Sequence, residues 1–411
     1  MGSTNVIVIG AGVVGVCCAL WLQKNGHKVI LIDRGDPGAG TSSGNACTIA
    51  DYACIPINNP KLFRQLPSLL FARQSPLSFD PLYVISHLGW ISKFLRNCSR
   101  SRVAYIIEAL GTLLQHTAAG LDPLIKATNS AQLFNDQGCL YVYQTKKAHE
   151  AAYPYNLSRL DHCVQFDWLK SDGIKDLEPG LNLNFYSGML FREARQVINP
   201  QMLVTRFFDH FVANGGEFIR TSVKGLDASG QAAVMLNGNT VPADKVIVAA
   251  GAFSKQIENT GTARLPLDTE RGYHVQFEGK QTLLQRPVGW AEAGLYATPT
   301  NEGLRLAGTV EIAGLEKPAN QRSLDYLTQK ANEMFNLEEK PQQTWLGYRP
   351  TLPDALPVIG QSVQSPHVYY AFGHQHIGLT LAGITGKLIS ELVAGQAPSV
   401  DISPFSPERF S

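Results

Sequence analysis

A glycine-rich segment near the N-terminus has the residues and the spacing to bind a dinucleotide. Gly10-Ala11-Gly12-Val13-Val14-Gly15 fits the pattern GxGxxG and follows a short apolar stretch, Val6 to Ile9. The first glycine suits a tight turn, the second lets backbone approach a pyrophosphate, and the third allows close helix–strand packing. The N-terminus of the following helix offers N–H groups and a positive dipole end to the phosphates. Asp33 ends the next strand, where its carboxylate can accept hydrogen bonds from a ribose diol.

This unit alone does not distinguish NAD from FAD. Two features favour the flavin cofactor: the unit begins the chain, and a second buried strand, Lys245 to Ala249, is followed by Ala250-Gly251. A glycine at that strand end can bring backbone beside the same dinucleotide. We therefore expect Ala250 and Gly251 to contact FAD.

The elements that must position these residues alternate between strands and helices. A strand at 6–9, a helix at 13–25 and a strand at 28–33 predict a parallel sheet. The segment 34–60 is rich in Gly, Ser, Thr, Asn and Pro, which indicates a long functional loop. Further helices are expected at about 80–130, 200–214, 323–336 and 378–395, further strands at 140–143, 245–249 and 368–371, and a hairpin at 234–241. The pattern predicts an α/β fold that contains a Rossmann-like domain.

The composition is that of a globular protein without a strong charge bias. Of the 411 residues, 44% are apolar. The chain has 35 Lys and Arg residues and 34 Asp and Glu residues, which gives a net charge of +1. This balance gives no basic footprint, so we expect no nucleic-acid partner. The apolar run 6–22 resembles a membrane segment, but its regularly spaced glycines and the lack of a preceding Lys or Arg favour the strand–turn–helix interpretation. The seven cysteines show no CxxC pair, so we expect no disulfide framework, no metal and a cytoplasmic location.

Beyond this unit, the sequence resembles the D-amino acid oxidase superfamily of FAD enzymes, and most of all bacterial D-amino acid dehydrogenases, including the D-hydroxyproline type, and glycine oxidase. The resemblance covers nearly the whole chain. It rests on the N-terminal unit, Thr41 to Ala46, Phe94 to Cys98, Val246 to Gly251, Arg271-Gly272-Tyr273, Gly347 to Pro350, Pro353-Asp354, Pro357 to Gly360 and Gly373 to Thr380. It implies a Rossmann-like FAD-binding domain at about 1–80, 195–255 and 345–411. A mixed-sheet substrate-binding domain at 81–194 and 256–344 would be interleaved with it.

The resemblance also implies which residues hold the cofactor. The loop Thr41 to Thr48 would wrap the ribityl chain and the flavin ring, and Val223 would either contact the adenine end or be an ordinary strand valine. Helix N–H groups after Gly373 would face the N1–C2=O edge of the flavin and stabilise the reduced ring. The expected FAD-binding residues are Gly10, Gly12, Val13, Val14, Gly15, Asp33, Arg34, Thr41, Ser42, Ser43, Asn45, Ala46, Val223, Ala250, Gly251, Gly373, His374, Gly378, Leu379 and Thr380.

Members of this superfamily transfer a hydride from the α-carbon of an amino acid to flavin N5, which leaves an imine. Arg349 is the predicted clamp for the substrate carboxylate, because a guanidinium group pairs with a carboxylate through two hydrogen bonds. Tyr273 is expected to donate to the same carboxylate, and His376 to line the site. For both His374 and His376 a role in holding the turn is the alternative. Tyr52, His274 and Tyr296 are further candidates that could equally be packed side chains with a satisfied polar tip.

Several predictions concern the cofactor linkage, the substrate and the partners. Gly347 and Asn45 stand where relatives carry a flavin-linking cysteine or histidine, so we expect non-covalent FAD. The block 374–380 resembles enzymes of D-hydroxyproline breakdown, which suggests a cyclic substrate such as D-proline or cis-4-hydroxy-D-proline. The alternatives are oxidation of a 2-hydroxy acid and a non-catalytic flavoprotein subunit. Either oxygen or a membrane quinone chain would accept the electrons, and peripheral contact with the inner membrane could involve Leu66 to Phe71.

Overall fold

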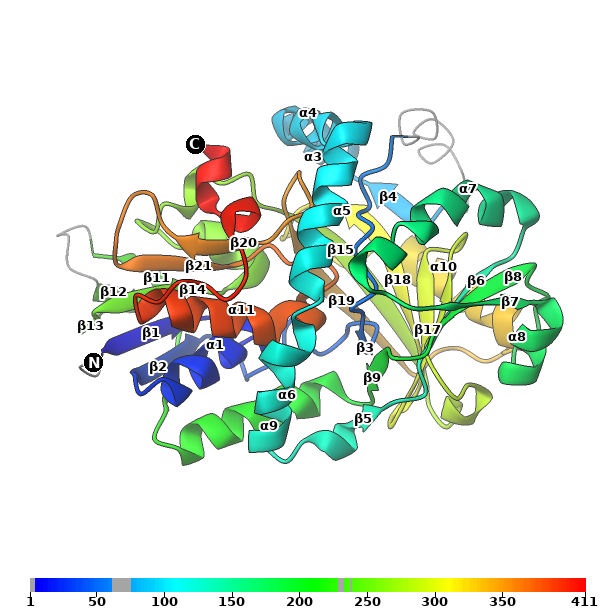
Figure 1. Ribbon diagram of the computed structural model, residues 1–411, viewed down its shortest axis with the longest axis horizontal. Coiled ribbons are helices and arrows are strands. Elements are labelled where there is room, and N and C mark those ends of the chain that lie inside the picture. The colour runs from blue at the N-terminus through cyan, green and yellow to red at the C-terminus, as the bar shows by residue number, and fades with distance from the viewer. Residues whose placement is uncertain (1–3, 61–74, 228–232, 237–238) are drawn as a thin grey trace.

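Two sheets organise the computed structural model, which describes residues 4–60, 75–227, 233–236 and 239–411 (Figure 1). The first sheet has the strand order β10-β2-β1-β14-β21-β20. Its strands are β10 (Glu217–Arg220), β2 (Lys28–Asp33), β1 (Asn5–Ile9), β14 (Lys245–Val248), β21 (Val368–Phe372) and β20 (Val358–Gln361). Neighbouring strands run parallel except β20, which is antiparallel to β21. The uninterrupted apolar runs of β1 and β14 follow from burial on both faces of a parallel sheet.

Helices cover one face of this sheet, and a small antiparallel sheet covers the other. The helices are α1 (Val13–Lys24), α11 (Gly378–Val393), α9 (Pro200–Ala213), α5 (Arg100–Leu114) and α6 (Thr117–Ala127). α1 and α11 pack closely because Gly386 has no side chain. A Cβ at this position would lie only 2.6 Å from the carbonyl oxygen of Cys17. On the other face, β11 (Val223–Leu226), β12 (Ala233–Leu236) and β13 (Thr240–Pro242) share an apolar core with the parallel strands.

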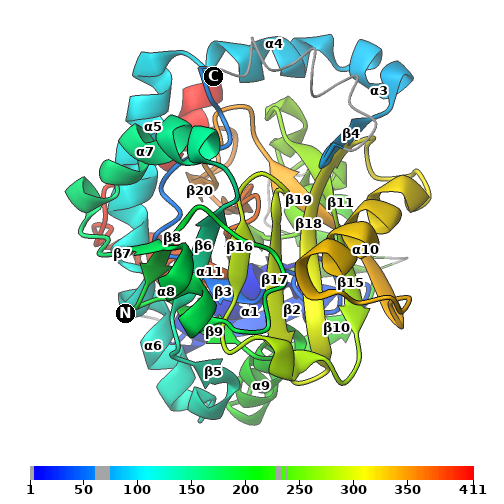
Figure 2. The ribbon, with the colours of Figure 1, turned by 90° about the vertical axis from the view of Figure 1, so that its right-hand side faces the viewer.

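The second sheet is mostly antiparallel and has the order β19-β15-β18-β17-β16-β6-β8-β7, with β4 beside β18. Its strands are β19 (Gln343–Thr351), β15 (Asp268–Phe277), β18 (Gly303–Ile312), β17 (Leu295–Thr300), β16 (Val288–Trp290), β6 (Cys139–Tyr143), β8 (Ser187–Phe191), β7 (Asp167–Lys170) and β4 (Leu77–Phe79). Helix α10 (Gln321–Phe335) covers one face and shares an apolar core with it (Figure 2). The opposite face is therefore left to contact the first half of the molecule.

Shorter elements join the two halves. β3 (Thr48–Ile49), β9 (Arg195–Val197) and β5 (Phe134–Asn135) form a small sheet between them. α3 (Pro81–Ser86) and α4 (Leu88–Arg96) lie at one end of the molecule, and α7 (Lys146–Leu157) and α8 (Ser171–Leu177) lie beside β6 to β8 (Figures 1 and 2). The helices and strands predicted from the sequence are present with bounds within a few residues, and the predicted α/β class with a mixed second sheet is confirmed.

The proposed division into domains stays a prediction, and three elements cross its boundaries. α5 and α6 fall within the segment assigned to the substrate domain, yet their apolar faces pack into the core under α1 and α11. β19 begins the third FAD-binding segment but forms the edge of the second sheet. These three elements therefore pack against the half of the molecule to which the prediction does not assign them.

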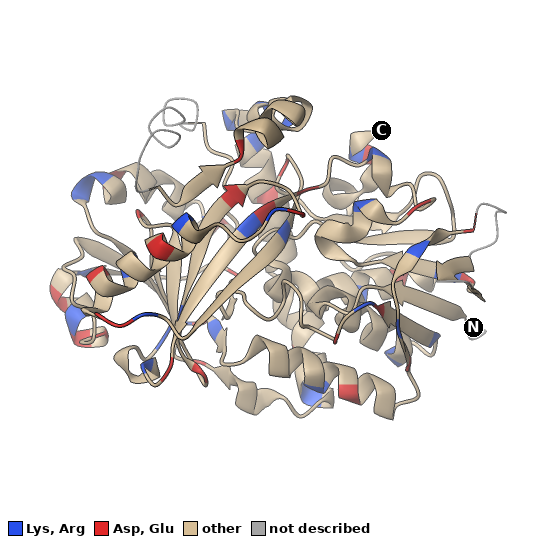
Figure 3. Cartoon of the chain, turned by 180° about the vertical axis from the view of Figure 1, so that it is seen from behind, with Lys and Arg blue, Asp and Glu red and all other residues tan. Residues whose placement is uncertain are grey.

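Charged residues of the two signs are mixed in the described part of the chain (Figure 3), whereas large exposed apolar side chains gather on α3 and α4 at Leu82, Ile85 and Leu88. Lys and Arg residues are interspersed with Asp and Glu along the ribbon (Figure 3). Among the described residues, no helix has the length and hydropathy needed to cross a bilayer. The stretch Leu66 to Phe71, for which membrane contact is predicted, lies outside the described residues.

Candidate active site

A large cavity of about 1160 Å³ lies where the two main sheets meet. Its wall is formed by the ends of β1, β2 and β14, the first residues of α1 and α11, the loop after β2, and strands β15, β18 and β19. The carboxyl ends of parallel strands open into it, which is where α/β sheets of this kind bind ligands. The cavity therefore joins the predicted cofactor site to the predicted substrate site.

The turn between β1 and α1 brings bare backbone to the cavity. Gly10 has a φ of +109°, and a Cβ at Gly15 would lie 1.8 Å from the carbonyl oxygen of Gly10. Both positions therefore require glycine. Gly12 precedes α1 without a capping side chain, and the Val13 N–H donates to Ser42 Oγ at 3.0 Å. The other N–H groups at this helix end suit a pyrophosphate.

Asp33, at the end of β2, organises the same turn. Its carboxylate accepts hydrogen bonds from the N–H groups of Ala11 at 2.7 Å and Gly35 at 2.9 Å. Carboxylate oxygens have further lone pairs, so the group can still accept from ribose hydroxyls. Arg34 lies over the ring of Phe253, 4.2 Å from its centroid, and both line the cavity. This end of the cavity has the chemistry to hold a ribose and a flat base.

The second sheet holds the loop Thr41 to Thr48 in place. Arg305 on β18 donates through Nη1 to two carbonyl oxygens of this loop, at 3.0 and 3.2 Å. His274 on β15 places Nδ1 2.9 Å from the carbonyl oxygen of Gly44. Burial, assisted by Arg305, lowers the pKa of His274 to about 3, so the ring is neutral and Nδ1–H can donate. The loop is therefore positioned from the substrate half of the molecule.

A tight turn before α11 supplies a second uncapped helix N-terminus. Gln375 has a φ of +49°, and its N–H donates to a backbone carbonyl of β19 at 2.9 Å. His374 Nε2 lies 2.9 Å from Thr385 Oγ1, and burial lowers the pKa of His374 to about 3. A neutral His374 thus holds the turn, while Gly378 and Leu379 begin the helix in the cavity wall.

The residues present fit FAD. One uncapped helix end can bind its phosphates, and the other can face the electron-rich edge of its ring. The predicted cofactor residues that line the cavity are Gly10, Gly12, Val13, Val14, Asp33, Arg34, Thr41, Ser42, Asn45, Ala46, Val223, Ala250, Gly251, His374, Gly378 and Leu379. Within the described part of the chain, four predicted residues do not line the cavity: Gly15, Ser43, Gly373 and Thr380. Two of them support packing, since Thr380 Oγ1 accepts the Ala50 N–H at 2.8 Å and a Cβ at Gly373 would lie 2.4 Å from Leu352.

Arg349, on β19, extends its guanidinium group across the face of the second sheet. The side chain passes over Gly272, where a Cβ would lie 2.3 Å from Nη2. Nη1 donates to the carbonyl oxygen of Thr309 at 2.7 Å, and Nη2 to that of Gly308 at 3.3 Å. Thr309 has a φ of +57°, which is rare for a β-branched residue. A guanidinium group has five N–H donors, so donors remain for a carboxylate in the cavity.

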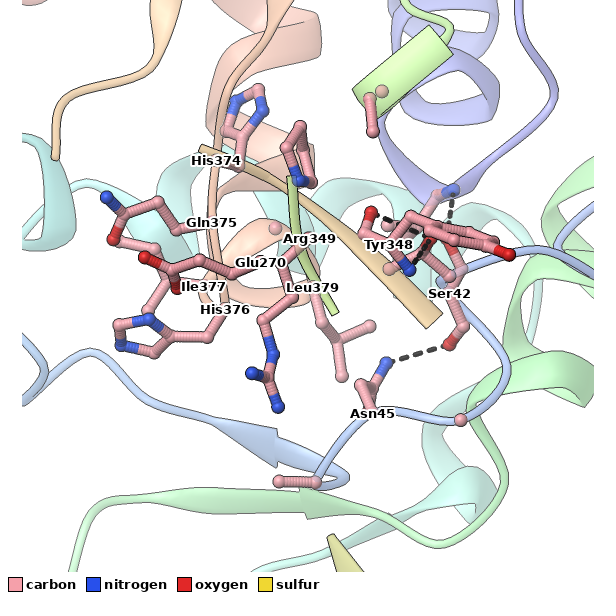
Figure 4. Close-up of a pocket in the computed structure, with 18 of the residues that line it drawn as sticks. Ser42, Asn45, Glu270, Tyr348, Arg349, His374, Gln375, His376, Ile377 and Leu379 are labelled. Atoms are coloured by element: carbon pink, nitrogen blue, oxygen red, sulfur yellow. Dashed lines mark hydrogen bonds between the residues drawn. The ribbon is translucent and has the colours of Figure 1, made fainter. Parts of the chain in front are cut away.

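Three further polar side chains lie beside Arg349 in the cavity wall (Figure 4). Glu270 on β15 is directly opposite Arg349 in the strand register, and burial raises the pKa of its carboxyl group to about 7, although Arg349 opposes this rise. His376 is exposed to the cavity, and the surrounding protein atoms, which remove its ring from bulk water, together with Arg349 lower its pKa to about 4, so the ring is neutral at pH 7. Gln375 Nε2 is buried without a hydrogen-bond partner among the described residues.

Tyr273 is among the residues that line the cavity, but it lies on the other face of β15, because side chains alternate along a strand. Its ring packs in the core below α10, and its hydroxyl group donates to Glu311 and accepts from the Asn320 N–H at 3.0 Å. The prediction that Tyr273 binds the substrate carboxylate remains a prediction, and the hydroxyl already has two partners. Tyr52 and Tyr296 line the cavity, with their hydroxyl oxygens 3.4 Å apart.

Sequence reasoning identified Arg349 and His376 but missed Glu270, Gln375 and the strained Thr309. A signal for Glu270 was available: with a period of two, it shares a strand face with Gly272, which belongs to the block Arg271-Gly272-Tyr273, and with the candidate His274. The sequence does not show which strand pairs with β15. It therefore could not predict that Glu270 lies next to Arg349.

Comparison with known proteins agrees with this geometry. The sequence matches the DAO family, described as FAD dependent oxidoreductase, over residues 5–392. It is 33% identical over 418 residues to a D-amino-acid oxidase from Bradyrhizobium diazoefficiens, covering 99% of each chain. It is 27% identical to D-amino acid dehydrogenase 2 from Mesorhizobium japonicum, covering 97% of this chain and 98% of the relative.

A solved structure shows the same fold. Glycine oxidase from Bacillus cereus superposes with a TM-score of 0.72 at 20% identity, covering 96% of this chain and 95% of the other. The family match over residues 5–392 and the 33% identical relative confirm the predicted family, the flavin cofactor and an oxidoreductase activity.

Proposed function

Because this chain belongs to the DAO family of FAD-dependent oxidoreductases, we propose that it oxidises the α-carbon of a D-amino acid to give an imino acid. The two relatives named for D-amino acids support the substrate class and its stereochemistry. The observation that carries the proposal is the position of Arg349. Its guanidinium group shares the cavity with the start of α11, where the flavin ring is expected.

Each part of the site has a task in this reaction. Bound FAD, held non-covalently, supplies the acceptor for a hydride. Arg349 binds the substrate carboxylate with the N–H groups that Gly308 and Thr309 leave free, and thereby fixes the α-carbon. The carbonyl bonds hold the guanidinium in one orientation, so less ordering is needed when the substrate binds. His376, neutral at pH 7, lines the same space without adding charge.

Within the D-amino acids, we propose a cyclic substrate such as D-proline or cis-4-hydroxy-D-proline. A secondary amine in a ring needs no extended side-chain channel. Hydride loss from its α-carbon would give a cyclic imine. The support for this choice is the block 374–380, of which Gln375 and His376 line the cavity.

Anaerobic mixing of the purified holoprotein with single substrates tests the proposal. The panel contains D- and L-alanine, D- and L-proline, cis-4-hydroxy-D-proline, and D- and L-lactate, and the readout is the loss of oxidised-flavin absorbance. We expect D-amino acids to reduce the flavin and the cyclic ones to do so fastest. Reduction by lactate and by none of the amino acids would overturn the proposal. Mixing the reduced protein with oxygen or with a quinone analogue then identifies the electron acceptor.

A further inference from the structure

Glu270 places a carboxyl group in the cavity without a partner. It is 6% exposed and lines the cavity, and it forms no hydrogen bond or ion pair with any residue that the structure describes. Its neighbour across the strand register is Arg349, whose own hydrogen bonds go to the carbonyl oxygens of Gly308 and Thr309. Burying a carboxyl group without a partner is costly, so the position calls for a ligand that pairs with it.

The charged groups around Glu270 are few. Arg349 faces it from β19, Asp268 lies two residues earlier on β15, and His376 lies in the wall before α11. Asp268 already accepts a hydrogen bond from the hydroxyl group of Tyr83 at 2.6 Å. Figure 4 shows the carboxyl group of Glu270 between the side chains of Gln375 and His376, with the guanidinium group of Arg349 farther along the same wall. A guanidinium and a carboxyl group from neighbouring strands thus share one wall of the cavity.

This arrangement is complementary to a zwitterion. An α-amino acid carries a carboxylate and an ammonium group on the same carbon, so Arg349 can bind the first while the second reaches Glu270. We propose that Glu270 binds the substrate ammonium group and accepts one of its protons before oxidation. The inference rests on the proposed function, because it assumes that Arg349 holds the carboxylate of an amino acid.

The proton and electron transfers balance as follows. One N–H bond of the ammonium group breaks, its electron pair stays on nitrogen, and the proton forms an O–H bond on Glu270. The Cα–H bond then breaks, and hydrogen leaves with both electrons to the flavin. The nitrogen lone pair forms the C=N bond of the product, so the substrate is oxidised by two electrons and FAD is reduced. Glu270 returns its proton to water in the cavity after the product leaves.

The chemistry explains why a carboxyl group is placed here. An ammonium nitrogen has no lone pair, so hydride loss from its α-carbon is blocked until a proton is removed. Burial raises the pKa of Glu270 to about 7, close to working pH, which suits a general base. A 2-hydroxy acid brings no positive group, so an ionised Glu270 would repel it. Glu270 would therefore favour amino acids over hydroxy acids.

Binding of unreactive ligands tests the charge complementarity apart from turnover. 2-Aminoisobutyrate has the carboxylate and the ammonium group but no α-hydrogen, whereas isobutyrate lacks the nitrogen. Both are titrated into wild-type holoprotein, Glu270→Gln and Glu278→Gln, with the flavin spectrum as readout. Glu278 lies just beyond the end of β15 and is exposed, so it serves as the control. In Glu270→Gln we expect 2-aminoisobutyrate to bind roughly 10- to 100-fold more weakly, because a charged hydrogen bond is lost. Isobutyrate should bind as well or better, because a negative charge is removed.

A purely structural Glu270 predicts a different result. If it only held Arg349 in place, Glu270→Gln would weaken both ligands together, or neither, and the proposal would be wrong. The opposite response of the two ligands is therefore the decisive observation.

The pH profile of anaerobic flavin reduction tests the proton transfer. In wild type, the second-order rate with the best D-amino acid should rise with pH through about 7, because ionised Glu270 is the base. Glu270→Gln should lose this step and reduce the flavin about 100-fold more slowly at pH 7, and Glu270→Asp should regain part of the rate. An unchanged profile in Glu270→Gln would refute the role of Glu270 while leaving the proposed function intact. If no D-amino acid reduces the wild-type flavin, the proposed function itself is wrong.

Discussion

The two ends of the cavity are built from different parts of the chain. At the cofactor end, the groups offered to a ligand are backbone N–H groups at the starts of α1 and α11, exposed by glycines. At the substrate end, they are side chains: Arg349 from β19, Glu270 from β15, and Gln375 and His376 from the turn before α11.

This difference decides what each end tolerates. A backbone site depends on the chain path, so it is sensitive to an added Cβ and insensitive to most side-chain exchanges. A side-chain site depends on individual functional groups and on the space in which they lie. Substitutions should therefore separate cofactor binding from substrate binding, and four of the following experiments test that separation.

The largest effect is expected from Gly15→Ala. The new Cβ would lie 1.8 Å from the carbonyl oxygen of Gly10, and neither backbone can move without opening the phosphate turn. We expect FAD affinity to fall by about 100-fold or more, corresponding to roughly 3 kcal/mol of overpacking. FAD titration of the apoprotein by flavin fluorescence measures this. Gly89→Ala on α4 has nothing within 4 Å of its Cβ and should bind FAD normally. Full FAD affinity in Gly15→Ala would contradict the backbone-site interpretation.

Arg349→Ala should impair substrate oxidation and leave FAD binding unchanged. Removing the guanidinium group takes away the partner of the substrate carboxylate, so kcat/KM should fall by about 100- to 1000-fold. The FAD spectrum and affinity should stay those of wild type, since no FAD-binding function is assigned to Arg349. Arg349→Lys keeps the charge but loses the paired geometry, and should recover only part of the activity. Loss of FAD from Arg349→Ala would show that the two ends are not independent.

The cofactor end could be predicted from sequence because its elements are contiguous. Strand, turn, helix and Asp33 follow each other within the first 33 residues, and the spacing of Gly10, Gly12 and Gly15 fixes the backbone path. The second helix N-terminus, at Gly378, was inferred from the resemblance, and the fold places it in the same cavity.

The substrate end could be predicted only in part because it depends on strand pairing. Glu270 and Arg349 are brought together by the β15–β19 register, which no local pattern specifies. Tyr273 belongs to the block Arg271-Gly272-Tyr273 on which the family resemblance rests. Strand alternation nevertheless directs its ring into the core under α10. The positive φ of Thr309 arises near a register shift between β15 and β18, which is likewise a tertiary feature.

Gly272→Ala probes the substrate end through space instead of charge. The new Cβ would lie 2.3 Å from Arg349 Nη2, so the guanidinium group must move away from Gly308 and Thr309. A displaced clamp should raise KM about 10-fold, with kcat changed less and FAD binding unchanged. In an Arg349→Ala background the same substitution should have no further effect, since its target is gone. Additive losses in the double variant would mean that Gly272 acts by another route.

A smaller effect is expected from Ser42→Ala, which tests the side-chain hydrogen bond to the first residue of α1. Ser42 Oγ accepts the Val13 N–H at 3.0 Å. Its loss should weaken FAD binding about fivefold, the equivalent of one ordinary hydrogen bond near 1 kcal/mol. The matched control is Ser43→Ala. Ser43 Oγ donates a hydrogen bond to the carbonyl oxygen of Gly40 at 3.0 Å, and Ser43 is not among the described residues that line the cavity. Equal losses in both variants would assign the effect to the loop instead of the helix end.

The smallest effect should be a pH dependence that the two ends share. Burial lowers the pKa of His374 behind the cofactor end, and of His274 on the second sheet, to about 3 in each case. A histidine whose pKa is lowered on folding takes up its proton more readily when unfolded. Stability should therefore fall as pH drops below about 6.5, and continue to fall toward 3. His374→Gln removes one such group and should reduce the acid-induced drop in melting temperature by a few degrees, measured by calorimetry between pH 7 and 4. If His274→Gln reduces the acid-induced drop in melting temperature equally, the buried neutral rings act alike in both halves. If a variant keeps the full wild-type dependence of melting temperature on pH, its histidine is protonated in the folded protein.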